Sequence, residues 1–349
     1  MIPTKAFAAY LPDQPLRPFE FSRRAPGPFD VHVEIYYCGV CHSDLHRARG
    51  EWENTHFPLV PGHEIVGVVK EVGKSVTKFK PGDLAAVGVI VDSCRVCESC
   101  KGHLEQYCDE SPTGTYNALA RDGSGYTRGG YSDHIVTDER FVYSISGQLD
   151  LPAIAPLLCA GITTYSPLKY AGVTRGSRVA VAGLGGLGHM GVKFAVAFGA
   201  EVTLLSHSPG KEADAKRLGA HHFIVSNGPD ELKKYHSQFD VVLNCISARH
   251  DYKKYLDLLA VNGKMLIVGL PPENPTLDPF AIIKNRRSII GSMIGGTDET
   301  QEMLDFCAAN HIVSDIELIP IQKIDEAYDR MIRGDVRFRF VIDMKSIRD

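Results

Sequence analysis

Cysteine and histidine residues in the N-terminal half have the types and spacing of transition-metal ligands. Cys41 and His63 each lie in a turn that contains glycine. A thiolate and an imidazole can share one zinc ion, and a catalytic zinc keeps one position open for a substrate. The remaining ligand must come from far along the chain, and we place it at Cys159. The carboxylate of Glu64, next to His63, can tune this metal or bind it transiently, so a catalytic zinc site is predicted.

Polar side chains close to Cys41 can move a proton. Asp44 can accept a hydrogen bond from a ligand imidazole and so fix its tautomer. Removal of a hydride from an alcohol first requires removal of the hydroxyl proton, and zinc makes that loss accessible. A hydroxyl that passes the proton to a histidine, which titrates near neutral pH, completes a path to water. Ser43 and His46 are therefore predicted to form a proton relay.

A second group of cysteines has the spacing of a structural metal site. Cys94, Cys97, Cys100 and Cys108 are separated by two, two and seven residues. Four thiolates fill a tetrahedral zinc site and leave no open position, so such a site holds a loop together without doing chemistry. An iron–sulfur cluster is an alternative, but this spacing matches neither ferredoxin pattern. Ordinary buried cysteines are the other alternative, and they would rarely fall three residues apart twice.

The middle of the chain carries a glycine-rich loop between two strands. Residues 178–182 are apolar and partly β-branched, residues 183–188 read Gly-Leu-Gly-Gly-Leu-Gly, residues 189–198 read as a helix, and residues 201–206 form the next strand. A GxGxxG motif in this strand–loop–helix–strand context indicates dinucleotide binding. The glycines let the backbone approach a pyrophosphate, which rests on the N-terminus of the helix.

The end of the second of these strands indicates which dinucleotide is bound. A site that prefers NAD has Asp or Glu there, bonded to the ribose 2′-hydroxyl. This chain instead has Ser206, His207 and Ser208, with Lys211 close behind. Two hydroxyls and a cation suit a 2′-phosphate, so NADP(H) is predicted. The alternative is that these residues merely open the next helix, over residues 211–218, and both interpretations can hold together.

Length and composition limit the class of protein. The 349 residues predict two domains. A content of 44% hydrophobic and 23% charged residues is typical of a soluble protein. The net charge of −4 and dispersed basic residues argue against nucleic acid as a partner. Glycines, His189 and Lys193 interrupt the longest apolar stretch, so no membrane span is expected. The N-terminus shows no secretory signal, and nine cysteines, four at metal spacing, favour the reducing cytoplasm.

Two structural classes alternate along the chain. In the first lobe, short β-like runs separated by glycine and proline turns predict an irregular, mostly antiparallel β lobe. In the second, strands alternate with helices, which predicts a parallel, doubly wound sheet of six strands. The expected strands are residues 32–37, 65–72 and 84–89 in the first lobe and 178–182, 201–206, 239–244, 263–269 and 288–292 in the second. Beyond residue 296 we expect a helix at 299–310, then extended segments, a helix at 324–333 and a strand at 338–342 that returns to the first lobe.

Taken together, these motifs resemble the zinc-dependent medium-chain dehydrogenase/reductase superfamily, and within it the cinnamyl-alcohol-dehydrogenase branch with its bacterial broad-range aldehyde reductases. The resemblance implies an α/β fold with a GroES-like catalytic domain over residues 1–157 and 296–349 and a Rossmann domain that binds NADP(H) over residues 158–295. It covers nearly the whole chain. Its carriers are residues 39–46, 60–64, 158–165, 183–188 and 335–340 and the four-cysteine group.

The resemblance also implies roles for individual residues. Cys41, His63 and Cys159 correspond to the catalytic zinc ligands, with Glu64 as an alternate fourth, and Glu51 to the outer end of the relay. Trp52, Tyr116, Leu119 and Ile294 correspond to positions that line the substrate pocket, although Trp52 could equally be a packing residue. The implied cofactor-binding residues are Thr163, Gly183, Gly185, Gly186, Leu187, Gly188, Ser206, Ser208, Lys211, Gly269, Ser292 and Arg339.

The predicted function is that of a zinc-dependent NADP(H) alcohol dehydrogenase or aldehyde reductase. It would carry two zinc ions per chain, act on aromatic or aliphatic aldehydes and alcohols, and form a homodimer through its cofactor domains, with residues 288–294 at the edge. A polyol dehydrogenase is a rival, but such relatives commonly lack the third cysteine ligand, which Cys159 supplies here. A non-catalytic NADPH-binding sensor is another; loss of Cys41 or His63 would have favoured it, and both are present.

Overall fold

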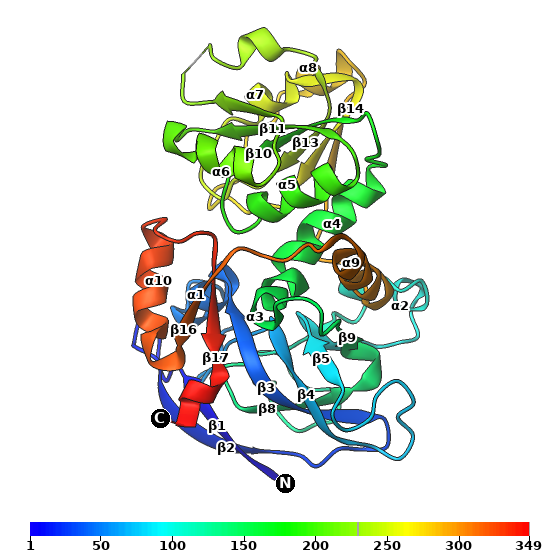
Figure 1. The fold of residues 1–349 in the computed structure, drawn as a ribbon, viewed down its shortest axis with the longest axis vertical. Coiled ribbons are helices and arrows are strands. Elements are labelled where there is room, and N and C mark those ends of the chain that lie inside the picture. Colours follow the sequence, from blue (N-terminus) through cyan, green and yellow to red (C-terminus); the bar gives the residue numbers. More distant parts are fainter. Residues whose placement is uncertain (229, 349) are drawn as a thin grey trace. The chain divides into compact units, whose positions relative to one another are not determined.

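The computed structural model of the protein describes residues 1–228 and 230–348 and forms two compact units (Figure 1). Unit 1 comprises Met1–Cys159 and Gly295–Asp349, and unit 2 comprises Ala160–Ile294. The assignment of a catalytic and a cofactor-binding role to these units stays a prediction. Among the described helices, none is by itself long and apolar enough to cross a membrane. Taken as one bent segment, the helices Leu151–Leu158 and Ala160–Tyr170 reach the length and apolar composition of a membrane span, and no other pair does so in the described part of the chain.

Unit 1 is built on a seven-stranded sheet whose central strand, β3, is long and buried. β3 pairs antiparallel with β4, with β8 and with the late strand β17, which confirms that the end of the chain returns to the first lobe. The β3–β4 register shifts twice, so the sheet is irregular as expected. The strands of this sheet are β3 (Asp30–Val40), β4 (Ile65–Val72), β5 (Leu84–Val87), β8 (His134–Asp138), β9 (Val142–Ser144), β16 (Ile316–Pro320) and β17 (Arg339–Asp343).

The remaining elements of unit 1 are short. Two more pairs of strands, β1 (Ile2–Ala8) with β2 (Arg17–Arg23) and β6 (Ile90–Asp92) with β7 (Thr113–Gly114), complete its β structure. Apolar residues of β1, β3, β4 and β17 meet in one core with the apolar face of α10. Burial of this face explains why a segment so late in the chain packs in unit 1. The helices are α1 (His42–Ala48), α2 (Glu98–Lys101), α3 (Leu151–Ile154), α9 (Thr297–Asn310) and α10 (Ile324–Ile332).

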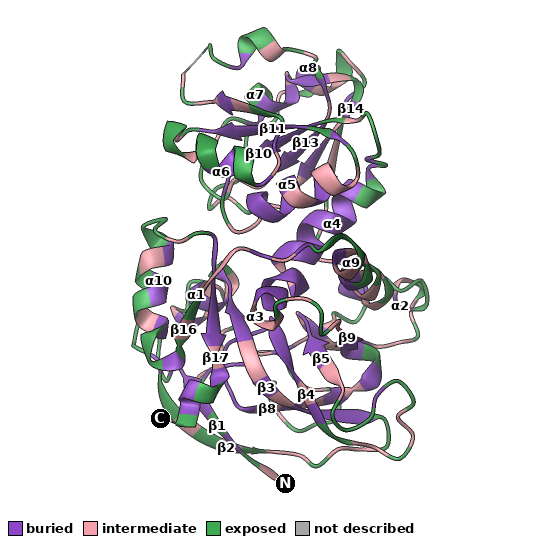
Figure 2. Ribbon diagram, in the orientation of Figure 1, coloured by how far each residue is buried: buried purple, intermediate pink, exposed green. Residues whose placement is uncertain are grey.

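Unit 2 contains a parallel sheet of six strands in the order β12-β11-β10-β13-β14-β15, which confirms the predicted Rossmann arrangement. Its central strands are buried on both faces, whereas α6 is largely exposed (Figure 2). Such burial is typical of parallel sheets covered by helices on both sides. The strands are β10 (Arg178–Ala182), β11 (Glu201–Ser206), β12 (His222–Val225), β13 (Phe239–Asn244), β14 (Leu259–Ile267) and β15 (Ser288–Gly291).

Chain order reverses between β10 and β13, which leaves a switch point at the carboxyl ends of these two strands, where ligands bind in open α/β sheets. The sequence predicts six strands in this sheet but does not locate one of them, β12. It has four residues, lies at the sheet edge and is half exposed, so its apolar pattern is weak. The helices of unit 2 are α4 (Ala160–Tyr170), α5 (Gly188–Ala197), α6 (Glu212–Arg217), α7 (Tyr252–Leu256) and α8 (Pro279–Ile283).

Candidate active site

Asp44 ties together the two segments that carry the first pair of predicted metal ligands. Cys41 caps the N-terminus of α1, and Asp44, on the first turn of that helix, is completely buried. One carboxylate oxygen of Asp44 accepts from the backbone N–H of Cys41 at 2.9 Å, and the other accepts from the N–H of Gly62 at 2.9 Å. A buried carboxylate needs such donors. The turn before His63 is thereby held against the start of α1.

The same carboxylate orients the imidazole of His63. Asp44 Oδ1 lies 3.2 Å from His63 Nδ1, and both side chains are buried. Burial opposes protonation of the ring, but the charges and hydrogen bonds of Asp44 and Cys41 together outweigh it and raise the pKa of His63 well above its usual value. A carboxylate on one ring nitrogen leaves the other, Nε2, available to a metal.

Four potential ligands converge although one of them is distant in sequence. Cys41, His63, Glu64 and Cys159 each offer an atom within 4.8 Å of the others. The sulfurs of Cys41 and Cys159 lie 3.9 Å apart. Two thiolates bound to one tetrahedral zinc, each with a bond of about 2.3 Å, are separated by nearly the same distance. Contact with the Cys159 thiol lowers the pKa of Cys41 well below its usual value, against the effect of burial. The donor set and its spacing therefore fit zinc.

Glu64 and Arg339 form a buried ion pair at this site. Arg339 Nη2 contacts Glu64 Oε1, and the two side chains are 7% and 0% exposed. Glu64 Oε2 is buried and has no hydrogen-bond partner among the described residues. Burial raises the pKa of Glu64 to about 7, although Arg339 opposes that shift. The unpaired oxygen is the atom with which Glu64 could reach a metal. Sequence reasoning missed this pair because 275 positions separate its members.

The predicted proton relay lies on α1. Ser43 Oγ is 3.7 Å from Cys41 Sγ. His46 follows three residues later on the same face of the helix. His46 Nδ1 is hydrogen-bonded to Glu51, and the ring of Trp52 stacks on the imidazole with centroids 5.4 Å apart. These contacts fix the orientation of the ring at the exposed end of the helix.

The four predicted substrate residues do not all lie beside the metal ligands. The ring of Tyr116 lies 5.7 Å from that of His63, and Trp52 lies against His46. Leu119 is 67% exposed and forms one bridge with Tyr126. Ile294 is the last residue of unit 2 and has a positive φ of 41°. Unit 1 therefore brings Trp52 and Tyr116 to the ligands and relay, whereas Leu119 points to solvent.

The four-cysteine group forms a second cluster in unit 1. Its sulfur atoms all lie within 4.8 Å of one another, and Cys94 Sγ and Cys100 Sγ are 3.8 Å apart. The backbone N–H groups of Cys97 and Cys100 each donate to the sulfur of the preceding cysteine at 3.4 Å, and Cys94 N–H donates to Cys108 Sγ at 3.4 Å. Donors at sulfur stabilise thiolates, and the separation again matches tetrahedral zinc. Four cysteines would fill every position of a tetrahedral zinc and leave none open.

In unit 2, each glycine of the GxGxxG loop has a distinct role. Gly183 has φ +92°, a conformation that favours glycine. A Cβ on Gly188, the first residue of α5, would lie 1.9 Å from the carbonyl oxygen of Gly183, so the helix can start this close to β10 only without a side chain. A Cβ on Gly185 would meet no atom within 4 Å. The space beside Gly185 is room for a ligand above the N-terminus of α5, which fits a pyrophosphate.

The polar residues after β11 lie next to this loop. Lys211 Nζ donates to the carbonyl oxygen of Leu184 at 2.6 Å, which links the end of β11 to the glycine loop. Burial lowers the pKa of Lys211, and only Asp214 opposes that shift. The buried Ser206 accepts from the N–H of Ser208 at 3.2 Å. A hydroxyl pair and a partly desolvated cation beside the loop fit a 2′-phosphate.

The other predicted cofactor residues divide between the units. Thr163 is buried on α4, and a Cβ on Gly269 would lie 2.4 Å from the carbonyl oxygen of Ile246, so the backbone approach there is close. Ser292 donates its N–H to the carbonyl oxygen of Ile267 at 3.3 Å. Gly186 and Leu187 complete the glycine loop. Arg339 belongs to unit 1, and its contact with Glu64 gives it a role at the metal ligands that the sequence did not suggest.

Comparisons with known proteins identify the family of this chain. Residues 27–147 match the family described as alcohol dehydrogenase GroES-like domain, and residues 186–309 match the family of zinc-binding dehydrogenases. The chain is 53% identical to the aldehyde reductase YahK of Escherichia coli, over 99% of both chains. It is 50% identical to the NADP-dependent alcohol dehydrogenase C 1 of Mycolicibacterium smegmatis, over the full length of both.

Solved structures give the same result. A cinnamyl alcohol dehydrogenase of Sorghum bicolor superposes with a TM-score of 0.95 at 42% identity, over 98% of both chains. A cinnamyl alcohol dehydrogenase of Helicobacter pylori, solved with NADP(H), superposes with a TM-score of 0.92 at 46% identity, over 99% of both. The chain therefore belongs to the zinc-dependent medium-chain dehydrogenase/reductase superfamily, a class of oxidoreductases. Within that class it falls in the cinnamyl-alcohol-dehydrogenase branch.

Proposed function

We propose that this protein is an NADP(H)-dependent zinc alcohol dehydrogenase that interconverts small aldehydes and alcohols. The observation that carries the proposal is the convergence of Cys41, His63 and Cys159 with the unpaired oxygen of Glu64. Two thiolates, one imidazole and an alternate carboxylate are the donor set of a catalytic rather than a structural zinc. The names of the similar bacterial and plant proteins support the same reaction class.

In this proposal, zinc supplies Lewis acidity at the substrate oxygen and NADPH supplies the hydride. Cys41, His63 and Cys159 hold the metal, and Asp44 keeps His63 in the correct tautomer. Ser43 hands a proton to the substrate oxygen during reduction and recovers it from His46. Glu51 holds His46 so that its ring can exchange this proton with water.

We propose that each chain binds a second zinc through Cys94, Cys97, Cys100 and Cys108. The sulfur separation of 3.8 Å and the N–H donors at sulfur support this. The cluster lies within a segment with little regular structure: α2 has four residues and β7 has two. Such a loop gains its stability from the metal rather than from a core of its own.

We further propose a preference for NADP(H) over NAD(H). Ser206, Ser208 and Lys211 support it, because no carboxylate stands at the end of β11 to bind a ribose 2′-hydroxyl. The 2′-phosphate would meet the cation of Lys211 and these hydroxyls. Reduction of aldehydes is the expected direction in the cell, since the NADPH pool is kept reduced. A cytoplasmic location stays a prediction.

A homodimer through unit 2 is also proposed. The strand β15 ends the six-stranded sheet, so one side of its backbone pairs with no other described strand and could pair with a second copy. Large apolar side chains in the segment between β14 and β15 are exposed, with Leu270 73%, Phe280 65% and Ile283 70% accessible. Such side chains are commonly covered in an oligomer.

The proposed function is tested by initial rates with a panel of aromatic and aliphatic aldehydes, with NADPH against NADH, and by zinc analysis. We expect two zinc ions per chain and faster turnover with NADPH. Cys41→Ser and His63→Ala should abolish turnover and leave NADPH binding intact. Turnover that persists in these variants would show that the metal assignment is wrong. One zinc per chain without turnover would instead favour an NADPH-binding sensor. Activity confined to sugar alcohols would favour a polyol dehydrogenase.

A further inference from the structure

The chain passes between the two units at two places. The first passage follows Cys159, a predicted ligand of the catalytic zinc. The second is a connecting segment, residues 292–297, that leaves unit 2 at Ile294 and enters unit 1 at Gly295. This segment carries two residues with predicted roles, Ser292 at the cofactor and Ile294 at the substrate. The contacts that fix it therefore bear on the reaction.

The loop that carries the four cysteines, residues 94–108, packs against the connecting segment where α9 begins (Figure 1). A Cβ on Gly296 would lie 1.7 Å from the carbonyl oxygen of His103, so the segment can approach the loop this closely only without a side chain. Glu105 follows two residues later in the loop, and its carbonyl oxygen accepts from the backbone N–H of Cys108 at 3.1 Å. The candidate structural zinc cluster and the connecting segment are thus close neighbours.

Glu105 supplies the N-terminal cap that α9 itself lacks. The residue before the helix, Gly296, has no side chain with which to cap it. One carboxylate oxygen of Glu105 accepts from the backbone N–H of Thr297 at 2.9 Å, and the other accepts from Thr297 Oγ1 at 3.0 Å. A carboxylate at a helix N-terminus also interacts favourably with the helix dipole. Glu105 is 7% exposed, so water competes little for these bonds.

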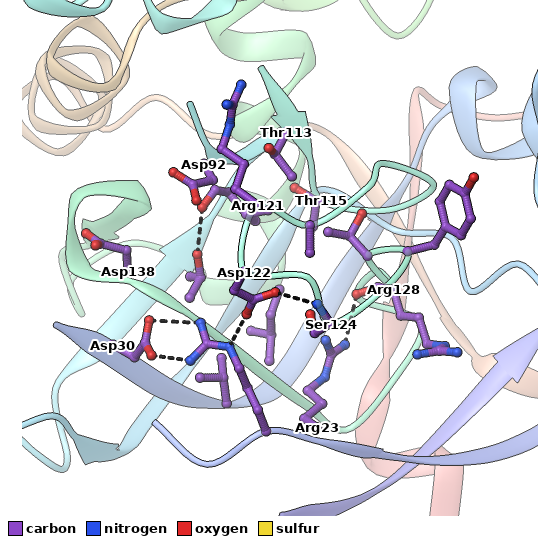
Figure 3. Close-up of a pocket in the computed structure, with 18 of the residues that line it drawn as sticks. Arg23, Asp30, Asp92, Thr113, Thr115, Arg121, Asp122, Ser124, Arg128 and Asp138 are labelled. Atoms are coloured by element: carbon purple, nitrogen blue, oxygen red, sulfur yellow. Dashed lines mark hydrogen bonds and ion pairs between the residues drawn. The ribbon is translucent and has the colours of Figure 1, made fainter. Parts of the chain in front are cut away.

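An anchor of this kind needs a fixed base, and the four-cysteine loop is held in unit 1 by other contacts. Arg121, which lines the pocket drawn in Figure 3, donates to the carbonyl oxygens of Glu110 at 3.2 Å and Ser111 at 2.7 Å, just beyond the loop. Arg95, within the loop, pairs with Asp138 of β8 at 3.1 Å. None of these atoms belongs to the connecting segment, so the loop is supported independently of it.

The backbone of Ile294 lies between two fixed points. Its φ of 41° is unfavourable for a β-branched residue. Such conformations persist where the surrounding structure over-determines them. On the side of unit 2, the N–H of Ser292 donates to the carbonyl oxygen of Ile267 at 3.3 Å. On the side of unit 1, Glu105 holds Thr297. Release of Glu105 would free the end of the segment that is nearer to Ile294 in sequence than the start of α9 is to any other predicted substrate residue.

We propose that Glu105 is a positioning residue for the dehydrogenase reaction, because it anchors the connecting segment and so fixes Ile294 for the substrate. The four-cysteine loop then contributes to turnover as well as to stability. This inference rests on the proposed function and on the predicted role of Ile294. The glycine loop and Lys211 belong to unit 2, and Ser292 is held there by Ile267. Loss of the anchor should therefore change the kinetics with the aldehyde and leave NADPH affinity unchanged.

The experiment compares Glu105→Ala and Glu105→Gln with the wild type as full-length, zinc-loaded proteins. Zinc is counted by elemental analysis, NADPH affinity is measured by fluorescence titration, and kcat/KM is measured at saturating NADPH with the aldehyde that the wild type reduces fastest. Glu105→Ala should keep two zinc ions and lower kcat/KM by about tenfold or more, since a misplacement of about 1 Å far from the reacting atoms can lower a rate about a hundredfold.

Glu105→Gln should restore the wild-type kcat/KM. Its amide oxygen can accept from the N–H of Thr297, and its amide N–H can donate to Thr297 Oγ1. Glu98→Ala is the matched control, a glutamate of the same loop whose side chain is 92% exposed and pairs only with Lys101 among the described residues. It should retain the zinc content, the NADPH affinity and the kcat/KM of the wild type.

Thr297→Val keeps the experiment decisive if Glu105→Ala loses zinc. This variant removes one of the two bonds to Glu105 and leaves the residues of the four-cysteine loop intact. It should lower kcat/KM by about threefold or more with both zinc ions retained.

Two outcomes would overturn the inference. In one, Glu105→Ala with both zinc ions, or Thr297→Val in its place, has the kcat/KM of the wild type. In the other, Glu98→Ala loses as much activity as Glu105→Ala. A wild type that reduces no aldehyde would instead refute the proposed function, and with it the kinetic role of Glu105.

Discussion

Replacement of Arg339 by methionine should reveal how much the buried ion pair with Glu64 contributes to unit 1. Glu64 is fully buried, and Arg339 is the only cation in contact with it among the described residues. Arg339→Met keeps most of the volume and leaves the carboxylate without a partner. Where the pH keeps Glu64 ionised, breaking a buried pair in this way costs about 3–5 kcal/mol in the free energy of unfolding. At roughly 2–4 °C per kcal/mol for a domain of this size, the melting temperature should fall by about 6–20 °C.

The loss should depend on pH in a definite direction. Glu64 has a folded-state pKa of about 7, above its unfolded value, so its effect on stability becomes less favourable as pH rises from the unfolded pKa to the folded one. Arg339 lowers this pKa, and its removal raises it further. The variant therefore loses stability over a wider pH range. The difference between wild type and variant should be small in acid and grow above pH 7.

The assay is thermal unfolding of the zinc-loaded wild type, Arg339→Met, Glu64→Gln and the double variant at several pH values. Since glutamine at position 64 removes the unpaired charge, the double variant should recover most of the stability that Arg339→Met loses. The reasoning would be refuted by a double variant no more stable than Arg339→Met, or by a difference from wild type that does not change with pH.

Four further predictions concern the proposed sites. Ser43→Ala should lower kcat by about a hundredfold or more with NADPH affinity unchanged, measured by steady-state kinetics and fluorescence titration, because the proton relay is interrupted. Lys211→Ala should raise the KM for NADPH about tenfold and leave that for NADH unchanged in the same assay. Cys97→Ser should lose one zinc per chain and lower the melting temperature, measured by elemental analysis and calorimetry. Gly188→Ala should abolish NADPH binding, because its Cβ would lie 1.9 Å from the carbonyl oxygen of Gly183. An affinity within twofold of wild type would contradict this.

Much of the fold could be predicted because its signals are local. The β10–α5–β11 unit can be located to within a residue or two, since an apolar strand, a glycine loop and a helix follow one another directly. The β12 strand escapes prediction, because an edge strand of four half-exposed residues carries little pattern. The β1–β2 pair likewise escapes it.

The candidate metal sites could likewise be predicted only as far as their signals are local. The spacing of Cys94, Cys97 and Cys100 indicates a metal ligand group without any knowledge of the fold, because three residues of separation suffice to bring thiolates together. The Cys41 and His63 pair is a weaker signal, since 22 positions separate its members and nothing local requires them to meet. The link that joins them is Asp44, which bonds to both segments.

The sequence by itself determined the residue chemistry: thiolates and imidazoles at metal spacing, a glycine loop between strand and helix, and hydroxyls with a lysine where a carboxylate would select NAD. These properties belong to the residues and their near neighbours. Only the tertiary structure decided which distant groups share a buried site, since burial and charge pairing depend on how strands far apart in the chain come together. The pairing of β17 with β3 places Arg339 against Glu64.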